Sequence, residues 1–258
     1  MIDWFDWIYE PAALYCLIGL GWAYALCIGP LRSRFEGQPL FPKKEALYFY
    51  LGLSILFIAV GSPFARIGAL YLFSVHVAMQ LLIVFPAASL LLLGLPSWML
   101  DTFLRLPIVR IFARILSHPW LMGALFVLMV SLWYVPRAFL WGMRNSINHC
   151  CEYSVIIAAG MLMAWPLLSP SKLYPSFRYG TRMVYLFGLE VAMTAVFSYL
   201  LMAEHAIYPN YVLAPRLIPG FDVLSDQAFG GILLSAISSL FFVGALGCAF
   251  YQWSKSSI

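Results

Sequence analysis

The sequence predicts an all-α fold, a polytopic membrane helical bundle with seven transmembrane helices, its N-terminus outside the cell and its C-terminus cytoplasmic. Seven long stretches are almost free of charged residues. Hydrophobic residues make up 63% of the chain and charged residues 10%, against about 25% charged in soluble domains. Lysine and arginine also collect in alternate connections between the stretches, which is the pattern that orients membrane proteins.

Each stretch is long enough to cross a bilayer, because about 20 apolar residues span a hydrocarbon core ~30 Å thick. The first three lie between Glu10 and Arg32, between Glu45 and Arg66, and between Arg66 and Asp101. The next two lie between Arg114 and Arg137 and between Glu152 and Lys172. The sixth, from Arg182 to Glu204, is interrupted only by Glu190, and the seventh runs from Asp226 to Lys255. We therefore predict spans close to residues 11–30, 46–64, 70–94, 117–136, 148–168, 183–203 and 228–250.

The spans are predicted to be helices. Lipid offers no partner for backbone amides, so a spanning segment must be a helix or part of a closed barrel. Barrel strands alternate in hydrophobicity over about ten residues, whereas these runs are apolar on all sides. The connections are short, so residues 1–258 should form a single integral membrane domain. The longest external connection, 205–227, contains three prolines, which predict an ordered irregular loop.

The orientation follows from the basic residues. Eleven fall in connections that we assign to the cytoplasm: Arg32, Arg34, Lys43, Lys44, Arg105, Arg110, Arg114, Lys172, Arg178, Arg182 and Lys255. The other face has four: Arg66, Arg137, Arg144 and Arg216. An excess of lysine and arginine marks cytoplasmic loops. The acidic N-terminal segment, with Asp3, Asp6 and Glu10, is thus predicted to lie outside.

Several functional classes lack support. The net charge of +4 reflects the loops, so we expect membrane lipids and no nucleic acid as partners. The sequence has no GxSxG, HExxH or P-loop motif, and we do not expect an enzyme.

Residues with metal-binding chemistry gather at the predicted outer face. His76 lies inside the third span, and His149 begins the fifth span. Met79 and Glu152 each follow one of these histidines by three residues, so each pair shares a helix face. Asp226 starts the seventh span on the same side, and Cys150 or Cys151 could add a thiolate. Imidazole, thioether and carboxylate groups at one bundle mouth would suit copper.

Two other polar residues are explained without a functional role. His205, at the outer end of the sixth span, is explained by solvation. Glu190 lies within the sixth span, where an ionisable group is costly. It could relay protons or ions, but no second carboxylate in mid-membrane continues a path, so we favour a hydrogen-bonded carboxyl that fixes helix packing.

Several segments in the same order resemble the CtaG family of bacterial cytochrome c oxidase (haem-copper oxidase) assembly factors. The segments are Phe73-Ser-Val-His76 continuing to Gly94-Leu-Pro96, Leu132-Trp133-Tyr134-Val-Pro136, and His149-Cys-Cys-Glu152-Tyr153 followed by Ala159-Gly160 and Trp165-Pro166. Tyr208-Pro209 and Ser225-Asp226-Gln227 before Gly230-Gly231 complete the match over roughly residues 70–235.

The sequence departs from the family pattern at three histidines. Gln80, Tyr134 and Tyr153 stand where the family has histidine, which leaves His76 and His149 as the matching pair. Glutamine and tyrosine can hydrogen-bond but are poor copper ligands. The resemblance therefore supports the fold more strongly than it supports a metal site.

The resemblance implies a bacterial plasma (inner) membrane protein that serves biogenesis of a haem-copper oxidase, with copper insertion at the outer face as its expected task. Its partners would be the oxidase subunits. His76, Met79, His149, Glu152 and Asp226 are the candidate copper ligands. One alternative is a permanent, copper-free accessory subunit of the oxidase. A second is a haem protein with His76 and His149 as axial ligands. A transporter is a further option, weakened by the absence of visible repeats.

Overall fold

The structure is a computed structural model that describes residues 11–35, 40–116 and 118–256. Within these ranges the chain forms helices and no strand. Six helices are long and apolar enough to cross a membrane, and a bent pair supplies a seventh pass. The predicted all-α bundle of seven spans is therefore confirmed, with the bent pair counted as one. Asp3, Asp6, Glu10 and Ser117, which entered the predictions above, lie outside the described residues.

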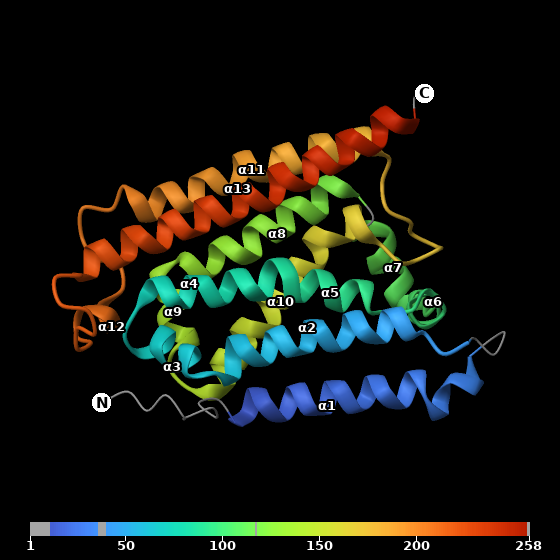
Figure 1. Cartoon of the computed structure of the whole chain (residues 1–258), viewed down its shortest axis with the longest axis horizontal. Coiled ribbons are helices and arrows are strands. Elements are labelled where there is room, and N and C mark those ends of the chain that lie inside the picture. The colour runs from blue at the N-terminus through green and yellow to red at the C-terminus, as the bar shows by residue number, and fades with distance from the viewer. Residues whose placement is uncertain (1–10, 36–39, 117, 257–258) are drawn as a thin grey trace.

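The spans lie side by side and alternate in direction (Figure 1). They are α1 (Pro11–Ile28), α2 (Lys43–Gly61), the continuous segment of α4 (Phe73–Leu82), η2 (Ile83–Ala87) and α5 (Ala88–Leu93), then α8 (Pro119–Tyr134), α10 (Ser146–Leu168), α11 (Tyr179–Leu201) and α13 (Val223–Ser256). These bounds differ from the predicted ones by a few residues at most ends, and α13 extends further at both ends than the predicted 228–250.

Short helices occupy the connections, and the sequence analysis missed them. They are η1 (Pro30–Arg34), α3 (Pro63–Leu70), α6 (Ser97–Leu104), α7 (Pro107–Leu116), α9 (Pro136–Gly142) and α12 (Pro209–Val212). Most begin at a proline, whose fixed φ and missing amide hydrogen suit the first turn of a helix. The same property separates α8 from α9, which meet at an angle of 77° across Val135. The predicted connection 205–227 is irregular apart from α12 and its last five residues, which form the start of α13.

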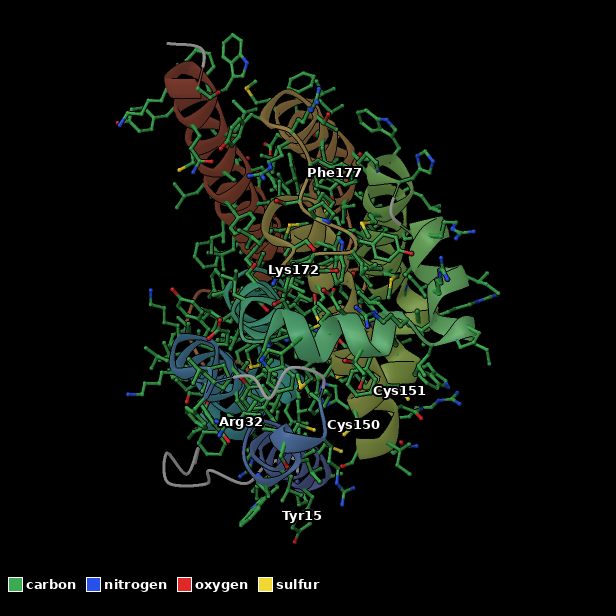
Figure 2. The ribbon with its side chains drawn as sticks, turned by 90° about the vertical axis from the view of Figure 1, so that its right-hand side faces the viewer. Tyr15, Arg32, Cys150, Cys151, Lys172 and Phe177 are labelled. Atoms are coloured by element: carbon green, nitrogen blue, oxygen red, sulfur yellow. The ribbon has the colours of Figure 1, made fainter. Side chains whose placement is uncertain are left out.

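The helix directions sort the basic residues by bundle end. η1, α6, α7, the start of α11 and the end of α13 lie at one end, which we call the basic end because the eleven residues assigned to the cytoplasm lie there (Figures 1 and 2). Figure 2 views the molecule from this end, where Arg32 and Lys172 are labelled. α3, α9 and α12 lie at the opposite end (Figure 1), with the other four basic residues nearby. Which end faces the cytoplasm stays a prediction.

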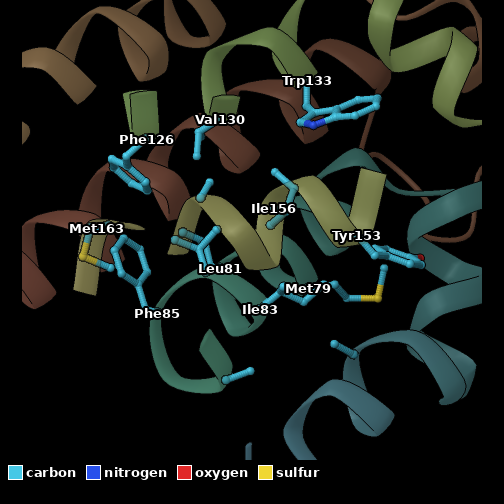
Figure 3. Packing of buried hydrophobic residues seen from close by; sticks show 14 of the residues in the cluster. Met79, Leu81, Ile83, Phe85, Phe126, Val130, Trp133, Tyr153, Ile156 and Met163 are labelled. Atoms are coloured by element: carbon cyan, nitrogen blue, oxygen red, sulfur yellow. The ribbon is translucent and has the colours of Figure 1, made fainter. Parts of the chain in front are cut away.

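The third span forms the centre of the bundle. Of its most apolar stretch, 72% of residues are buried, against 22% in α1 and in α13. It packs closely on α10 at Gly160, where an added Cβ would lie 2.4 Å from the carbonyl oxygen of Val84. η2 is one turn of π-helix that contains Pro86, and such a turn accommodates a residue that cannot donate to the preceding turn. Figure 3 shows the core where α4 and η2 meet α8 and α10.

Candidate functional site

The candidate site centres on the carboxylate of Glu152, which is fully buried in α10. Nε2 of His76, on α4, lies 3.0 Å from Oε1 of Glu152. Nε2 of His149, one turn earlier on α10, lies 3.7 Å from Oε2. The two imidazole rings are nearly parallel, with centroids 6.3 Å apart. We call these three residues the His–Glu cluster, and they bring together three of the five residues predicted from the sequence.

Local structure fixes the position of the cluster. The side chain of Asn145 accepts a hydrogen bond from the amide of Asn148 and so caps the start of α10. His149 and Glu152, three residues apart, then lie on the helix face that meets α4. α9 approaches the cluster at Gly142, where an added Cβ would lie 2.9 Å from Oε2 of Glu152. Gly142 thus gives the carboxylate its space, a role that the sequence analysis missed.

Gln80 completes the hydrogen bonding of the cluster. Its side-chain nitrogen donates to Oε1 of Glu152 over 2.7 Å and lies 3.0 Å from Nε2 of His76. Gln80 follows His76 by four residues on α4, so their side chains are neighbours on one helix face. The four-residue spacing between His76 and Gln80 is visible in the sequence, and it could have predicted that Gln80 belongs to the site.

Aromatic side chains cover the cluster on the α12 side. The ring of Phe139 contacts the ring of His76 with centroids 5.1 Å apart, and Tyr208 of the 205–227 connection packs on Phe139 at 4.4 Å. The Tyr208 hydroxyl donates to the carbonyl of Tyr134, and the Tyr211 hydroxyl donates to the carbonyl of Gly68. Burial raises the pKa of the Tyr208 phenol, which keeps it protonated as a donor. This cover excludes water from His76.

Asp226, a predicted ligand, lies against the start of α4 in the structure. Its carboxylate is buried and accepts hydrogen bonds from the amides of Phe73 and Ser74 and from the Ser74 hydroxyl. These are the free amides at the start of α4, so Asp226 caps that helix from α13. Both carboxylate oxygens are engaged, which leaves Asp226 supporting His76 through the backbone of α4.

The other candidates lie apart from Glu152 or face outward. Met79 is buried, with its methyl group close to Gly68 of α3. His205 is exposed, as its solvated interpretation predicts. Cys151 is exposed. Oε1 of Glu190 accepts a hydrogen bond from the hydroxyl of Ser239 and so joins α11 to α13, in line with the packing interpretation.

The donor set meets part of what copper requires. Two donor atoms bound to one metal at about 2.0 Å in tetrahedral geometry lie about 3.3 Å apart, a spacing bracketed by the 3.0 Å and 3.7 Å separations between the imidazoles and the carboxylate. Among the described residues, however, no three His, Cys, Asp or Glu side chains are arranged to hold a metal as they stand. The donor types of the cluster are therefore ones that copper accepts, but its three side chains are not arranged as a metal site as they stand.

Haem fits the geometry less well. The carboxylate of Glu152 contacts Nε2 of both histidines. An iron bound by both histidines would have to occupy the space that the Glu152 carboxylate fills. The haem ring around it would also need a wide cleft between α4 and α10. These helices instead pack with the cluster residues at most 4% exposed.

Comparison with models of known protein families identifies the family of the chain. Residues 22–256 match the family model described as cytochrome c oxidase caa3 assembly factor (Caa3_CtaG). No curated protein and no solved structure matches the chain significantly.

Proposed function

Because the chain belongs to the caa3 (CtaG) family of cytochrome c oxidase assembly factors, we propose that it assists the assembly of a haem-copper oxidase by holding a copper ion transiently at the His–Glu cluster. The protein is a multi-pass membrane protein. We place it in the bacterial plasma membrane, with the cluster near the outer face and the oxidase subunits as its partners.

One observation carries the proposal. Two imidazoles from different helices converge on a single buried carboxylate. Burial of an ionisable group in a membrane is costly, and such groups tend to mark functional sites. Imidazole suits copper as well as iron and zinc, and the choice of copper rests on the oxidase-assembly family to which the chain belongs.

The three residues that replace histidines of the family pattern, Gln80, Tyr134 and Tyr153, lie around the His–Glu cluster. Gln80 donates to Glu152, the ring of Tyr153 lies 4.4 Å from the ring of His149, and the buried Tyr134 lines a small pocket together with Gln80. Replacing three imidazoles by an amide and two phenols around one carboxylate weakens metal binding. We therefore propose a copper affinity suited to brief holding.

A second candidate is a permanent accessory subunit that binds no copper. The observation in its favour is that Gln80 donates to Oε1 of Glu152 and lies 3.0 Å from Nε2 of His76, so this carboxylate oxygen has a hydrogen-bond donor without a metal. A stable subunit would bury a large contact with the oxidase, typically above ~2,000 Å² in total for obligate partners.

Purification in mild detergent from native membranes separates the candidates. Copper at up to one ion per chain, lost in Glu152→Gln and retained in Glu190→Gln, would support copper holding. Stable oxidase without copper in the purified protein would support the accessory subunit. A Soret absorption band that disappears with His76→Ala would support haem and overturn both.

A further inference from the structure

A small cavity lies next to the His–Glu cluster, between α4, η2, α8, α10, α11 and α13. Its walls are apolar except at Gln80, Tyr134 and Ser238. The space open to the centre of a water molecule is about 10 Å³, close to the ~10–15 Å³ that one water needs on that measure. The cavity therefore has room for about one water molecule and for nothing larger.

Two of the polar walls have unmet hydrogen-bonding capacity. Oε1 of Gln80 and Oγ of Ser238 are buried and have no hydrogen-bond partner among the residues that the structure describes. Their residues are 4% and 1% exposed. Leaving a buried polar group without a hydrogen bond costs about 1–3 kcal/mol. Two such atoms in the wall of one cavity therefore indicate that the cavity holds a hydrogen-bonding group.

Ser238 differs from two other helical serines of this chain, Ser54 and Ser154. The hydroxyls of Ser54 and Ser154 donate to the carbonyl four residues earlier, the common local solution for serine in a helix. Ser238 makes no such bond. Its hydroxyl is thus available to a group inside the cavity.

From this arrangement we infer that the cavity binds one water molecule, which accepts a hydrogen bond from the Ser238 hydroxyl and donates one to Oε1 of Gln80. This inference stands on the cavity and its two unpaired atoms and does not depend on copper.

The water would fix the orientation of the Gln80 amide. With its oxygen bonded to water, the amide presents its nitrogen to Glu152, as the 2.7 Å contact requires. A flipped amide would place its oxygen against the carboxylate, and two acceptors repel. Ser238 is therefore a positioning residue that acts on Glu152 through water and Gln80.

A high-resolution structure of the full chain in a lipid nanodisc tests the inference directly. We expect one density peak within about 3 Å of both Ser238 Oγ and Gln80 Oε1. An empty cavity, with the Ser238 hydroxyl turned onto the Leu234 carbonyl, would overturn it, as would density larger than a water molecule.

Infrared spectroscopy supplies an independent readout. In the wild-type protein, an O–H stretching band of buried water should shift when the solvent is exchanged for H₂¹⁸O. The band should be lost in Ser238→Ala and kept in Ser235→Ala, a partly buried serine of α13 that does not line the cavity. With ¹³C-labelled glutamine, the Gln80 carbonyl band, assigned by its loss in Gln80→Leu, should move in Ser238→Ala alone. A Gln80 band that is the same in both serine variants would refute the positioning role.

Discussion

Nε2 of His76 lies 3.0 Å from Oε1 of Glu152, and the amide nitrogen of Gln80 lies within hydrogen-bond distance of both atoms. One imidazole nitrogen can either donate a proton or accept one. If Nε2 carries hydrogen it bonds Glu152, and if it does not it accepts from Gln80. The three contacts therefore cannot all be satisfied at once, and the proton-free form of Nε2 is also the form that a metal binds.

Replacing Gln80 by histidine should strengthen copper binding. The new imidazole would extend from α4 toward Glu152 in place of an amide that is a poor ligand. We expect copper affinity to rise by about tenfold or more, the size of effect seen when groups around a metal change. Competition titration with a copper chelator measures it. Gln80→Leu is the control and should not gain affinity; equal affinity in Gln80→His and wild type would contradict the assignment of the site.

Gly142→Ala should disturb the cluster without changing any residue of α4 or α10. The added methyl group would lie 2.9 Å from Oε2 of Glu152, nearer than real Cβ contacts allow, so the carboxylate or α9 must shift. We expect weaker copper binding in the same titration. Gly244→Ala is the matched control, because a Cβ there meets nothing within 4 Å. The role given to Gly142 is wrong if both variants bind copper as the wild type does.

Asp226→Ala should destabilise the fold through α4. The change removes the buried cap on the amides of Phe73 and Ser74, and loss of a helix cap costs up to about 2 kcal/mol. Thermal unfolding in detergent should show a lower midpoint than in Asp222→Ala, which removes an exposed cap from α13. If Asp226→Ala instead abolishes copper binding while leaving the midpoint unchanged, Asp226 is a ligand and the cap is incidental.

The sequence predicted the seven spans well because charge-free runs and lipid solvation leave few alternatives. It paired His76, His149 and Glu152 correctly because helical spacing and a shared bundle end restrict where such residues can point. It could not show that Asp226 would turn to the amides of Phe73, since that depends on how α13 meets α4. The short helices and the contribution of Gly142 depend on tertiary contacts in the same way.

Membrane orientation should follow the basic end. In a cysteine-free variant, a single cysteine at exposed Leu213 should react with an impermeant maleimide on intact cells, and one at exposed Ser33 should react only after the cells are opened. The expected difference follows from the eleven-to-four split of basic residues. The reverse pattern would place the cluster near the cytoplasm and remove the proposed action at the outer face.

The copper content of the oxidase tests the central claim most directly. A strain that lacks this protein is complemented with the wild-type chain or with His76→Ala plus His149→Ala, and copper per haem is measured in the purified oxidase. Copper holding at the His–Glu cluster predicts that deletion lowers the ratio, that the wild type restores it, and that the double variant restores it only in part. Copper holding would be contradicted if the double variant restored copper per haem fully while the deletion strain still lost oxidase. The accessory-subunit role would then be the remaining account.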